Sequence, residues 1–292
     1  MKQLFKRWLQ LKWYLIKLYT VTLLKVLIGK VSWNKWFSDI EMSKAQFRLK
    51  LWKSIYFNYR TMPSYYAKKM PVWIYGKINF YDLSGKVLPI NDNIKSGMVN
   101  IGIMDPVRSS DSITSIELSG TIHLGNNIVI RQGTKFRIAG HLYLEDNTFI
   151  GDNSTIIISD NSRIQKNSII AHNCIIMDTD IHYTLDITSR IVKRNSSPIN
   201  IGRNNWIGAF TMVKKGVKTP SFLITIGPYS CLTKDYSKIF PEYACVGGCP
   251  VKLIRKDLIK ANNITEKKLN TFFSSSDSNF FQYNDDINSF YS

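Results

Sequence analysis

The stretch of sequence that decides the fold runs from Leu124 to Ile176 and reads LGNNIVIRQGTKFRIAGHLYLEDNTFIGDNSTIIISDNSRIQKNSIIAHNCII. Large apolar residues recur in it at six-residue steps, and a two-residue insertion makes the whole pattern repeat every twenty residues. The nine repeating positions are Leu124, Ile130, Phe136, Leu144, Ile150, Ile156, Ile164, Ile170 and Ile176. A second column, of small residues, follows several of them by four positions: Thr134, Thr148, Ser154, Ser168 and Cys174. A fixed period of this length predicts a solenoid of stacked coils.

Short polar triplets separate the apolar hexads, and they read GNN, EDN, GDN, SDN and AHN. Asn, Asp and Gly accept a left-handed backbone conformation at little cost, so these triplets are expected at corners. Each coil then has three short faces whose aliphatic residues point inward, and successive coils stack about 4.8 Å apart through backbone hydrogen bonds. A β-sandwich with strands at regular spacing is the alternative that this pattern leaves open.

The hexads return after residue 197. They read IGRNNW from Ile201 to Trp206, IGAFTM from Ile207 to Met212 and IGPYSC from Ile226 to Cys231. Their aliphatic, glycine and small residues follow the order [LIV]-G-x-x-[STA]-x. These residues resemble the hexapeptide-repeat acyltransferases, and the resemblance covers residues from about 102 to 255.

The closing segment carries the most specific part of the resemblance. Leu232 to Asp235 (LTKD), Ala244 to Pro250 (ACVGGCP) and Val251 to Arg255 (VKLIR) look like the end of the maltose/galactoside and polysaccharide O-acetyltransferases. The match departs from the family pattern at Val251, where alanine is usual, and at Pro228, where small residues are customary. The resemblance implies a mainly β fold, a left-handed parallel β-helix, and assembly as a homotrimer.

The domain organisation that we expect has three parts. Residues 1–80 form a basic, aromatic-rich helical region, and residues 81–255 form the β-helix, with an inserted loop at 183–197. Residues 256–292 turn rich in Asn, Ser and Asp, which predicts a short helix followed by a polar tail.

Composition excludes several classes of protein. Four cysteines, none in a CxxC pair, are too few for a disulfide scaffold and fit a reducing, cytoplasmic compartment. Lys12, Lys17 and Lys25 interrupt the first apolar stretch, so we expect neither a signal peptide nor a spanning helix there. Neither a Walker loop nor GxGxxG is present, which argues against nucleotide hydrolysis and dinucleotide redox chemistry.

Positive charge is concentrated at the N-terminus. The net charge is +18, and the first 70 residues hold fifteen Lys and Arg against only Asp39 and Glu41. Apolar residues there recur at helical spacing together with four tryptophans, namely Trp8, Trp13, Trp33 and Trp36. Such a helix fits peripheral contact with the inner face of an anionic membrane, or a cap packed on the protein or on a neighbouring subunit, and both interpretations stay open. No nucleic-acid-binding motif is present, so we expect no nucleic-acid partner.

The chain has four histidines, and His123, His141 and His172 lie within the regular repeat. His182 ends the segment MDTDIH, where the hexads stop and the inserted loop begins. The resemblance places the catalytic base on His182, because a family DxDxH-like segment before such a loop supplies that histidine. Imidazole suits this role, since it can accept a hydroxyl proton near neutral pH.

Three polar residues near His182 are candidates for supporting roles. Side chains alternate along a strand, so Asp178 and Asp180 are expected to share a face with His182, where a carboxylate would orient the imidazole. The alternative is that one or both only shape the corner. Asn173 is a weaker candidate, for orienting the acceptor.

The resemblance also implies a binding site for acetyl-CoA, the acyl donor, between neighbouring subunits. Trp206, Gly208 and Ala209 would line the thioester and the pantetheine arm. Thr233 and Lys234 would contact the pantetheine and the nucleotide. Lys252 and Arg255 would meet the adenosine phosphates, as cations suit phosphate groups. No metal is expected.

The sequence therefore predicts a CoA-dependent O-acyltransferase, most simply an O-acetyltransferase. It would act by direct transfer on a sugar of a bacterial surface polysaccharide or its lipid-linked precursor. The alternatives are an N-acyltransferase that acts on an amino sugar, a γ-type carbonic anhydrase, and a β-helix scaffold without activity. The carbonic anhydrase requires three zinc-binding histidines, and His172 and His182 lack that family's close pair.

Overall fold

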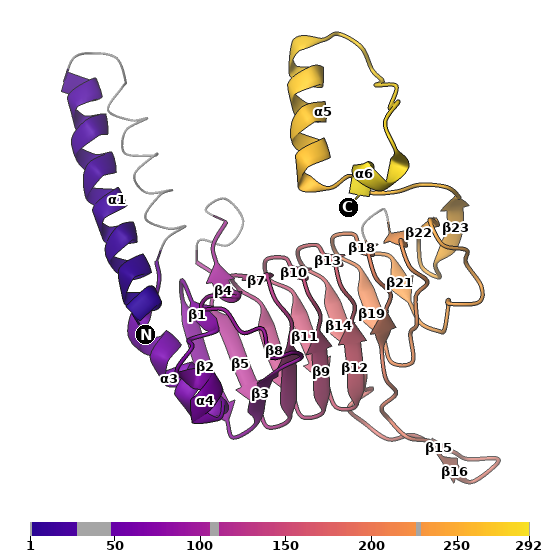
Figure 1. Ribbon diagram of the computed structural model, residues 1–292. Helices are drawn as coiled ribbons and strands as arrows, with labels where there is room; N and C mark the ends of the chain where they lie inside the picture. Colours follow the sequence, from indigo (N-terminus) through magenta and orange to yellow (C-terminus); the bar gives the residue numbers. More distant parts are fainter. Residues whose placement is uncertain (1, 28–47, 106–110, 226–228, 292) are drawn as a thin grey trace.

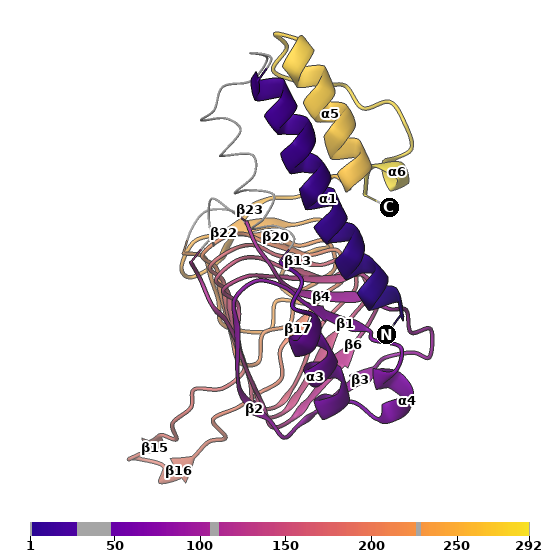
Figure 2. The same ribbon diagram turned by 90° about the vertical axis from the view of Figure 1, so that its left-hand side faces the viewer.

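The computed structural model describes residues 2–27, 48–105, 111–225 and 229–291. Apart from a two-stranded hairpin, its strands form three sheets that run side by side along one axis, and the chain visits these sheets in turn (Figure 1). Figure 2 looks along that axis from the N-terminal end, and the chain turns anticlockwise from sheet to sheet as it recedes. The predicted left-handed parallel β-helix is therefore confirmed.

The three faces are called sheets 1, 2 and 3, in the order in which a coil meets them. Sheet 1 contains β1 (Val72–Ile74), β4 (Val99–Ile103), β7 (Ile128–Arg131), β10 (Phe149–Ile150), β13 (Ile169–Ile170), β18 (Trp206–Ile207), β20 (Ile224–Thr225), β22 (Cys245–Gly247) and β23 (Lys252–Arg255). Sheet 2 contains β2 (Ile78–Leu83), β5 (Thr114–Leu118), β8 (Lys135–Ile138), β11 (Thr155–Ile158), β14 (Ile175–Met177), β19 (Met212–Lys214) and β21 (Cys231–Leu232). Sheet 3 contains β3 (Lys86–Pro89), β6 (Thr121–Leu124), β9 (His141–Leu144), β12 (Asn161–Ile164) and β17 (Asn200–Ile201). Neighbouring strands are parallel except β22 and β23.

The periodic apolar residues form the core of the β-helix. All nine are buried, with at most 4% of their surface exposed. They pair in the twenty-residue register that the sequence predicts, so that Ile130, Ile150 and Ile170 stack in successive coils. Each coil buries its aliphatic side chains against those of the next, and neighbouring coils therefore stabilise one another.

The small residues of the second column join one coil to the next. The Ser154 hydroxyl donates to the carbonyl of Ala171 at 3.0 Å, and it accepts the backbone N–H of Cys174 at 3.2 Å. Ser168 likewise donates to Gly202 O at 2.9 Å. A small polar side chain is required because it satisfies buried backbone groups of the following coil.

Asparagines turn the corners, as predicted. Those with a positive φ are Asn127, Asn147, Asn153, Asn167, Asn173 and Asn204. Their side chains also form a ladder, since Asn127 Nδ2 donates to Asn147 Oδ1 at 2.8 Å and Asn147 Nδ2 donates to Asn167 Oδ1 at 2.9 Å. The SDN triplet differs, because Asn161 begins β12 and does not have a positive φ.

One coil is much longer than the rest. Ile170 pairs with Ile207, 37 residues along the chain rather than twenty. The extra residues leave the β-helix after β14 and form an antiparallel hairpin of β15 (Leu185–Asp186) and β16 (Ile191–Val192), which projects from the body (Figure 1). The inserted loop expected at 183–197 lies within this segment.

Helices cover the N-terminal end. They are α1 (Lys2–Leu27), α3 (Leu51–Thr61) and α4 (Ser64–Ala67), and the first coil begins at Val72. The Asn58 side chain donates to Val72 O at 2.7 Å and accepts Val72 N–H at 3.1 Å, and Ser54 Oγ accepts Ile74 N–H at 2.9 Å. The polar face of α3 therefore pairs with the first edge strand, which would otherwise expose unpaired backbone groups. No helix in the described ranges is long and apolar enough to cross a bilayer. Trp33 and Trp36 lie outside the described residues, as does the predicted hexad segment at 226–228.

The C-terminal segment contains α5 (Asn263–Ser275) and α6 (Ile287–Tyr291). The Asn262 side chain caps α5 by accepting the N–H groups of Ile264 and Thr265. The ring of Tyr291 meets the edge of Phe222 with 5.0 Å between centroids, so the tail returns to the β-helix. A cavity of about 550 Å³ lies between this segment and sheet 1, and none of the site residues predicted from the sequence lines it.

Candidate active site

The long hairpin leaves and rejoins the β-helix between sheets 2 and 3. We call this edge the hairpin corner, formed by residues 178–199, 215–217 and 233–234 of three successive coils. The base of the hairpin is closed by an antiparallel bridge between Thr179 and Ser196 and by a hydrogen bond from Asp180 N to Asn195 O at 2.8 Å. Asn195 Nδ2 also donates to Ile181 O at 3.0 Å. These bonds join the outgoing and returning strands of the hairpin immediately before His182.

His182 follows this base directly, and its side chain is exposed. Its backbone N–H donates to Asp180 O at 2.7 Å, and the residue between them, Ile181, has a φ of 67°. That bond together with that φ describes a tight γ-turn, which is rare and strained for a β-branched residue. Such strain persists only where the surroundings enforce it, and it concentrates at functional positions. The structure therefore holds His182 at the protein surface on an enforced turn.

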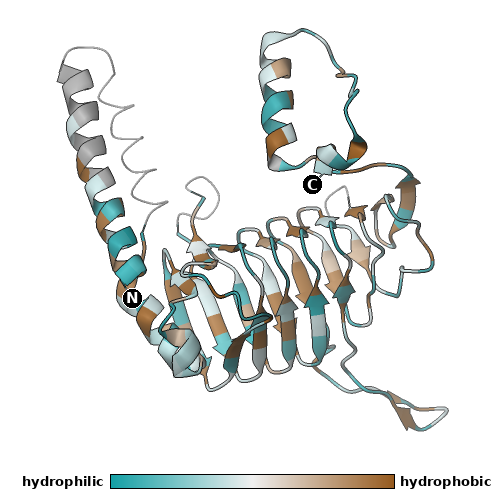
Figure 3. Ribbon diagram, in the orientation of Figure 1, coloured by the Kyte–Doolittle hydropathy of each residue, from teal (hydrophilic) through white to brown (hydrophobic). Residues whose placement is uncertain are grey.

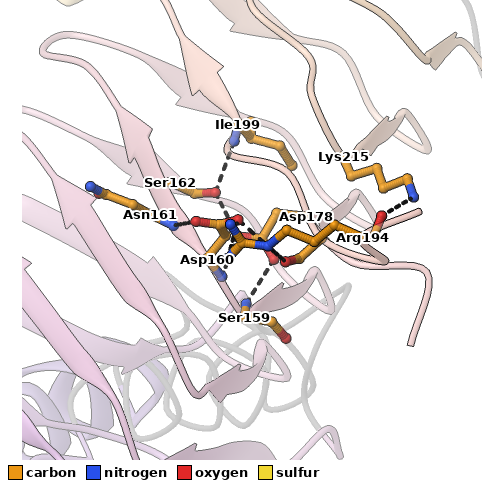
Figure 4. Close-up of polar contacts among 9 residues, drawn as sticks. Ser159, Asp160, Asn161, Ser162, Asp178, Arg194, Ile199 and Lys215 are labelled. Carbon is orange, nitrogen blue, oxygen red and sulfur yellow. Dashed lines mark hydrogen bonds and ion pairs between the residues drawn. The ribbon is translucent and has the colours of Figure 1, made fainter. Parts of the chain in front are cut away.

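Asp178 does not share a face with His182, contrary to the alternation that the sequence predicts. Its carboxylate is fully buried, and it accepts hydrogen bonds from Ser159 N at 2.7 Å, Asp160 N at 3.1 Å and Ser162 Oγ at 2.7 Å (Figure 4). Burial raises the pKa of this carboxyl group, while the three donors oppose the shift. The reason for the difference is that β14 ends at Met177, so strand alternation does not extend to these residues.

Asp180 faces away from the interior, toward two lysines of the next coil. One carboxylate oxygen lies 2.5 Å from Lys215 Nζ and the other lies 3.6 Å from Lys214 Nζ. The hydrogen bond from Lys215 is the main reason that the pKa of Asp180 is lowered. In this chain Asp180 therefore anchors the base of the hairpin.

A second ion pair holds the returning strand of the hairpin. Arg194 lies 3.1 Å from the carboxylate of Asp160, and Ser196 Oγ donates to the same carboxylate oxygen at 3.2 Å. Lys215 Nζ also approaches Arg194 O at 3.4 Å (Figure 4). The sequence analysis missed Asp160, Arg194 and Lys215. The sequence shows only that these residues are polar and lie near corners. Their partners come from other coils, so no local pattern predicts the contacts.

Asn173 lies at a different corner, between sheets 1 and 2. It is one of the corner asparagines with a positive φ, and its N–H donates to Asp152 O at 2.8 Å. The strand β14 separates it from the hairpin corner. Within one chain the structure does not bring Asn173 and His182 together.

The residues predicted to line the acyl arm lie on sheet 1 and its following corner. Trp206 is half-buried in β18, and Ala209 is half-buried just beyond it. The N–H of Gly208 donates to Thr225 Oγ1 at 2.5 Å, and a Cβ at Gly208 would lie 2.4 Å from Thr225 O. The close approach of the next coil therefore explains why a glycine is needed here. Its N–H is already hydrogen-bonded to Thr225.

The predicted phosphate-binding residues fall into two groups. Thr233 and Lys234 are exposed and lie at the hairpin corner, in the second coil after the hairpin. Lys252 and Arg255 are exposed in β23, the last strand of sheet 1. Two strands, β20 and β22, separate β23 from β18, so Trp206 and this pair of cations are about 14 Å apart along the axis.

Comparison with known proteins gives likenesses only among solved structures. No family model matches, and no curated protein matches. The polysialic acid O-acetyltransferase OatWY is 18% identical, with a TM-score of 0.39, covering 68% of this chain and 100% of that one. The N-acyltransferase AntD from Bacillus cereus, in complex with dTDP and 3-hydroxybutyryl-CoA, is 13% identical, with a TM-score of 0.35 and coverage of 71% and 89%. A hexapeptide-repeat acetyltransferase from Vibrio cholerae, in complex with acetyl-CoA, is 14% identical, with a TM-score of 0.33 and coverage of 75% and 88%.

The fold assignment rests on the register of the coils and not on these identities and TM-scores. The chain has the hexapeptide-repeat β-helix fold. In this β-helix the described ranges contain no cluster of three His, Cys, Asp or Glu side chains that could hold a metal ion. The hairpin corner is the part of the β-helix that departs most from its regular repeat, and it carries His182.

Proposed function

We propose that the protein is a CoA-dependent acyltransferase that transfers an acetyl group to a sugar hydroxyl. The observation that carries the proposal is His182, exposed on a strained turn at a corner that also carries Thr233 and Lys234. The acceptor is a sugar of a bacterial surface polysaccharide or of its lipid-linked precursor. The known acetyltransferases with bound acetyl-CoA and with polysialic acid as substrate agree with this class of reaction.

The proposed reaction needs one base and no covalent intermediate on the protein. The imidazole of His182 accepts the proton of the acceptor hydroxyl as its oxygen attacks the thioester carbonyl. The new C–O bond gives the acetyl ester, and the C–S bond of the thioester breaks. The CoA thiolate then takes the proton back from the imidazolium, so the histidine is restored.

A second copy of the chain is expected to complete the site. His182 leaves from the hairpin corner, whereas Trp206 lies on sheet 1, and the strand β17 of sheet 3 separates the two positions in the chain. An acetyl-CoA molecule that contacts both His182 and Trp206 would have to lie between two neighbouring β-helices. A threefold arrangement of three-sided prisms provides three such equivalent sites, and we therefore propose a homotrimer.

Replacement of His182 tests the assignment. His182→Ala is expected to lower turnover at least 100-fold, because a general base contributes about 10²- to 10⁴-fold. CoA affinity should stay unchanged, since the imidazole acts on the acceptor. His172→Ala is the matched control, because that ring lies at a regular corner against Phe210. If His182→Ala retains more than about a tenth of wild-type turnover, His182 is not the base.

The nature of the acceptor needs a separate test. An ester product is cleaved by hydroxylamine, whereas an amide product resists it, so treatment of the labelled product separates O-transfer from N-transfer. Mass spectrometry of the host polysaccharide with and without the protein would identify the sugar. Absence of acyl transfer to any carbohydrate, with all catalytic residues intact, would favour the scaffold alternative.

A further inference from the structure

Helix α3 exposes three of its four aromatic residues, and the fourth, Phe57, is buried in the core of the β-helix. Its inner face combines Phe57 with buried Ser54 and Asn58, which pair with the edge strand β1. Its outer face carries Trp52, Tyr56 and Tyr59, which are 78%, 54% and 41% exposed. These three residues follow one another at helical spacing and form a single stripe. A soluble helix normally buries such a stripe, so this outer face indicates a surface that is covered by something else.

Helix α1, at the same end of the β-helix, also leaves apolar side chains exposed (Figures 1 and 2). Leu4 and Leu11 are buried in a small core with Leu49, Met70 and Tyr75, so α1 is attached to the body by one side. A second apolar stripe remains exposed, and it consists of Phe5, Leu9, Trp13 and Ile16. We call the two exposed stripes together the aromatic end face.

Positive charge surrounds the aromatic end face. The sequence contains no acidic residue between Glu41 and Asp82, but the described part of this interval holds Arg48, Lys50, Lys53, Arg60, Lys68 and Lys69. It also holds Lys77, which is paired with Asp111 at 3.1 Å. Beside α4 a hollow of about 610 Å³ is lined by four lysines, Lys2, Lys68, Lys69 and Lys95, and by no acid. This combination of charge and aromatic rings matches an anionic partner with an apolar layer beneath its charges.

We propose that the aromatic end face docks the protein on the surface of an anionic lipid bilayer. Tryptophan and tyrosine favour the interface, where the ring is in contact with acyl chains and its polar atom with water, and lysines favour the anionic headgroups. A second copy is a poorer occupant, because two like-charged end faces would repel each other. The proposal extends the membrane interpretation of the N-terminus to α3 and to the lysine hollow, and it is independent of acyl transfer.

Docking through this end has a consequence for the rest of the molecule. The axis of the β-helix would point away from the bilayer, because α1, α3 and α4 lie at its first coil (Figure 2). The hairpin leaves after β14, several coils farther along the axis. His182 would therefore stand above the membrane surface rather than within it.

Co-sedimentation with vesicles tests the proposal on the full-length chain. Wild type should bind phosphatidylglycerol–phosphatidylcholine vesicles, bind phosphatidylcholine vesicles weakly, and dissociate as salt rises. The double variant W52A/Y56A should lower the partition coefficient at least about tenfold, because two interfacial rings are lost. Lys68→Gln should lower it up to about fivefold at low salt, the share of one cation near an anionic leaflet. Phe280→Ala is the matched control, since that ring is 76% exposed at the C-terminal tail and should leave binding unchanged.

Three outcomes would overturn the proposal. They are equal binding by W52A/Y56A and wild type, equal binding to anionic and neutral vesicles, and a lower molar mass of W52A/Y56A in solution, which would make the stripe an interface between copies. Both replaced side chains are exposed, and the single variant Tyr56→Ala repeats the test if the double variant does not fold. Acyl transfer to a soluble acceptor should be the same in W52A/Y56A and wild type, which separates failure of docking from failure of the proposed function.

Discussion

The carboxylate of Asp180 lies 2.5 Å from Nζ of Lys215, and this ion pair ties the start of the hairpin to the next coil. Lys214, on the other side, is 3.6 Å from the same carboxylate group. Asp180 stands two residues before His182, on the opposite side of the strained turn at Ile181. The Asp180–Lys215 ion pair therefore helps to position the backbone of His182, and the imidazole itself is not part of that pair.

Loss of this ion pair should loosen the hairpin without unfolding the β-helix. In Lys215→Met, amide exchange at Ile181 and His182 should become faster, and kcat should fall more than the affinity for CoA. Global stability should change by about 1 kcal/mol or less, because both side chains of the pair are still partly in contact with solvent. Lys218→Met is the matched control, since Lys218 makes a similar exposed pair with Asp235 at 3.2 Å. Exchange rates that rise equally in both variants would contradict a specific role for Lys215.

Acid should weaken the same anchor. The pKa of Asp180 is lowered below its ordinary value of 3.8, chiefly by the hydrogen bond from Lys215. A carboxyl group with a lower pKa in the folded protein stabilises it above pH 3.8, and that contribution is lost as the pH falls through the folded-state pKa. Proteolysis or amide exchange in residues 183–194 should therefore rise in this acid range before the coils unfold. Asp180→Asn should show the fast rate already at neutral pH, and an unchanged acid response in that variant would contradict the assignment.

The sequence predicted the coils well because each coil is a local pattern. Ile150 and Ile170 are buried because they occupy positions of a twenty-residue repeat that is visible in the sequence. Asn147 turns a corner because asparagine tolerates the positive φ required there. The surroundings of the predicted site were harder to predict. Strand alternation was extended past Met177, where the strand ends, so the buried position of Asp178 was missed. The partners of Asp180 were missed because Lys215 comes from the next coil, beyond the long hairpin, and no local pattern joins the two residues.

Gly208 gives the same lesson for a binding residue. A glycine in a hexad was assigned to ligand approach through a family resemblance. The structure shows Thr225 of the next coil against it, so the requirement for glycine comes from stacking. A motif shared by a whole family includes positions that make the fold as well as positions that bind ligand, and one sequence does not separate them.

Two exposed lysines should contribute to CoA binding. Lys234→Ala and Lys252→Ala are each expected to weaken CoA binding by about 1–3 kcal/mol if the ammonium group meets a phosphate. Titration calorimetry with CoA and with 3′-dephospho-CoA shows which lysine meets the 3′-phosphate. The variant that lacks this lysine should bind the two ligands with the same affinity. Lys238→Ala, at another exposed lysine, should bind CoA like wild type. Wild-type affinity in both Lys234 and Lys252 variants would reject this donor site.

The hairpin should also contact a neighbouring copy. Hydrophobic residues occur along the projecting hairpin (Figure 3). Two of them, Ile187 and Val192, are 79% and 54% exposed in the single chain. Light scattering should give the mass of a trimer for wild type, and the double variant Ile187→Asp, Val192→Asp should shift the distribution toward monomer. The matched control is Ile264→Asp, because Ile264 is 69% exposed in α5, away from the hairpin. A monomeric wild type would remove the proposal of a site shared between subunits.

Ser154 offers a direct test of how one coil is joined to the next. Its buried hydroxyl donates to Ala171 O and accepts Cys174 N–H, so Ser154→Ala leaves two buried backbone groups without a partner. We expect the variant to lose about 1–3 kcal/mol of unfolding free energy, measured by urea denaturation. Ser154→Thr should retain most of the stability, because Thr134 occupies the equivalent position of the previous coil and donates to Gly151 O at 3.3 Å. Ser159→Ala, at an exposed serine beside the same strand, should change stability by less than about 0.5 kcal/mol. If Ser154→Ala were as stable as Ser159→Ala, the small-residue column would reflect only the space available inside the coil, and the hydroxyl bridges would contribute nothing to stacking.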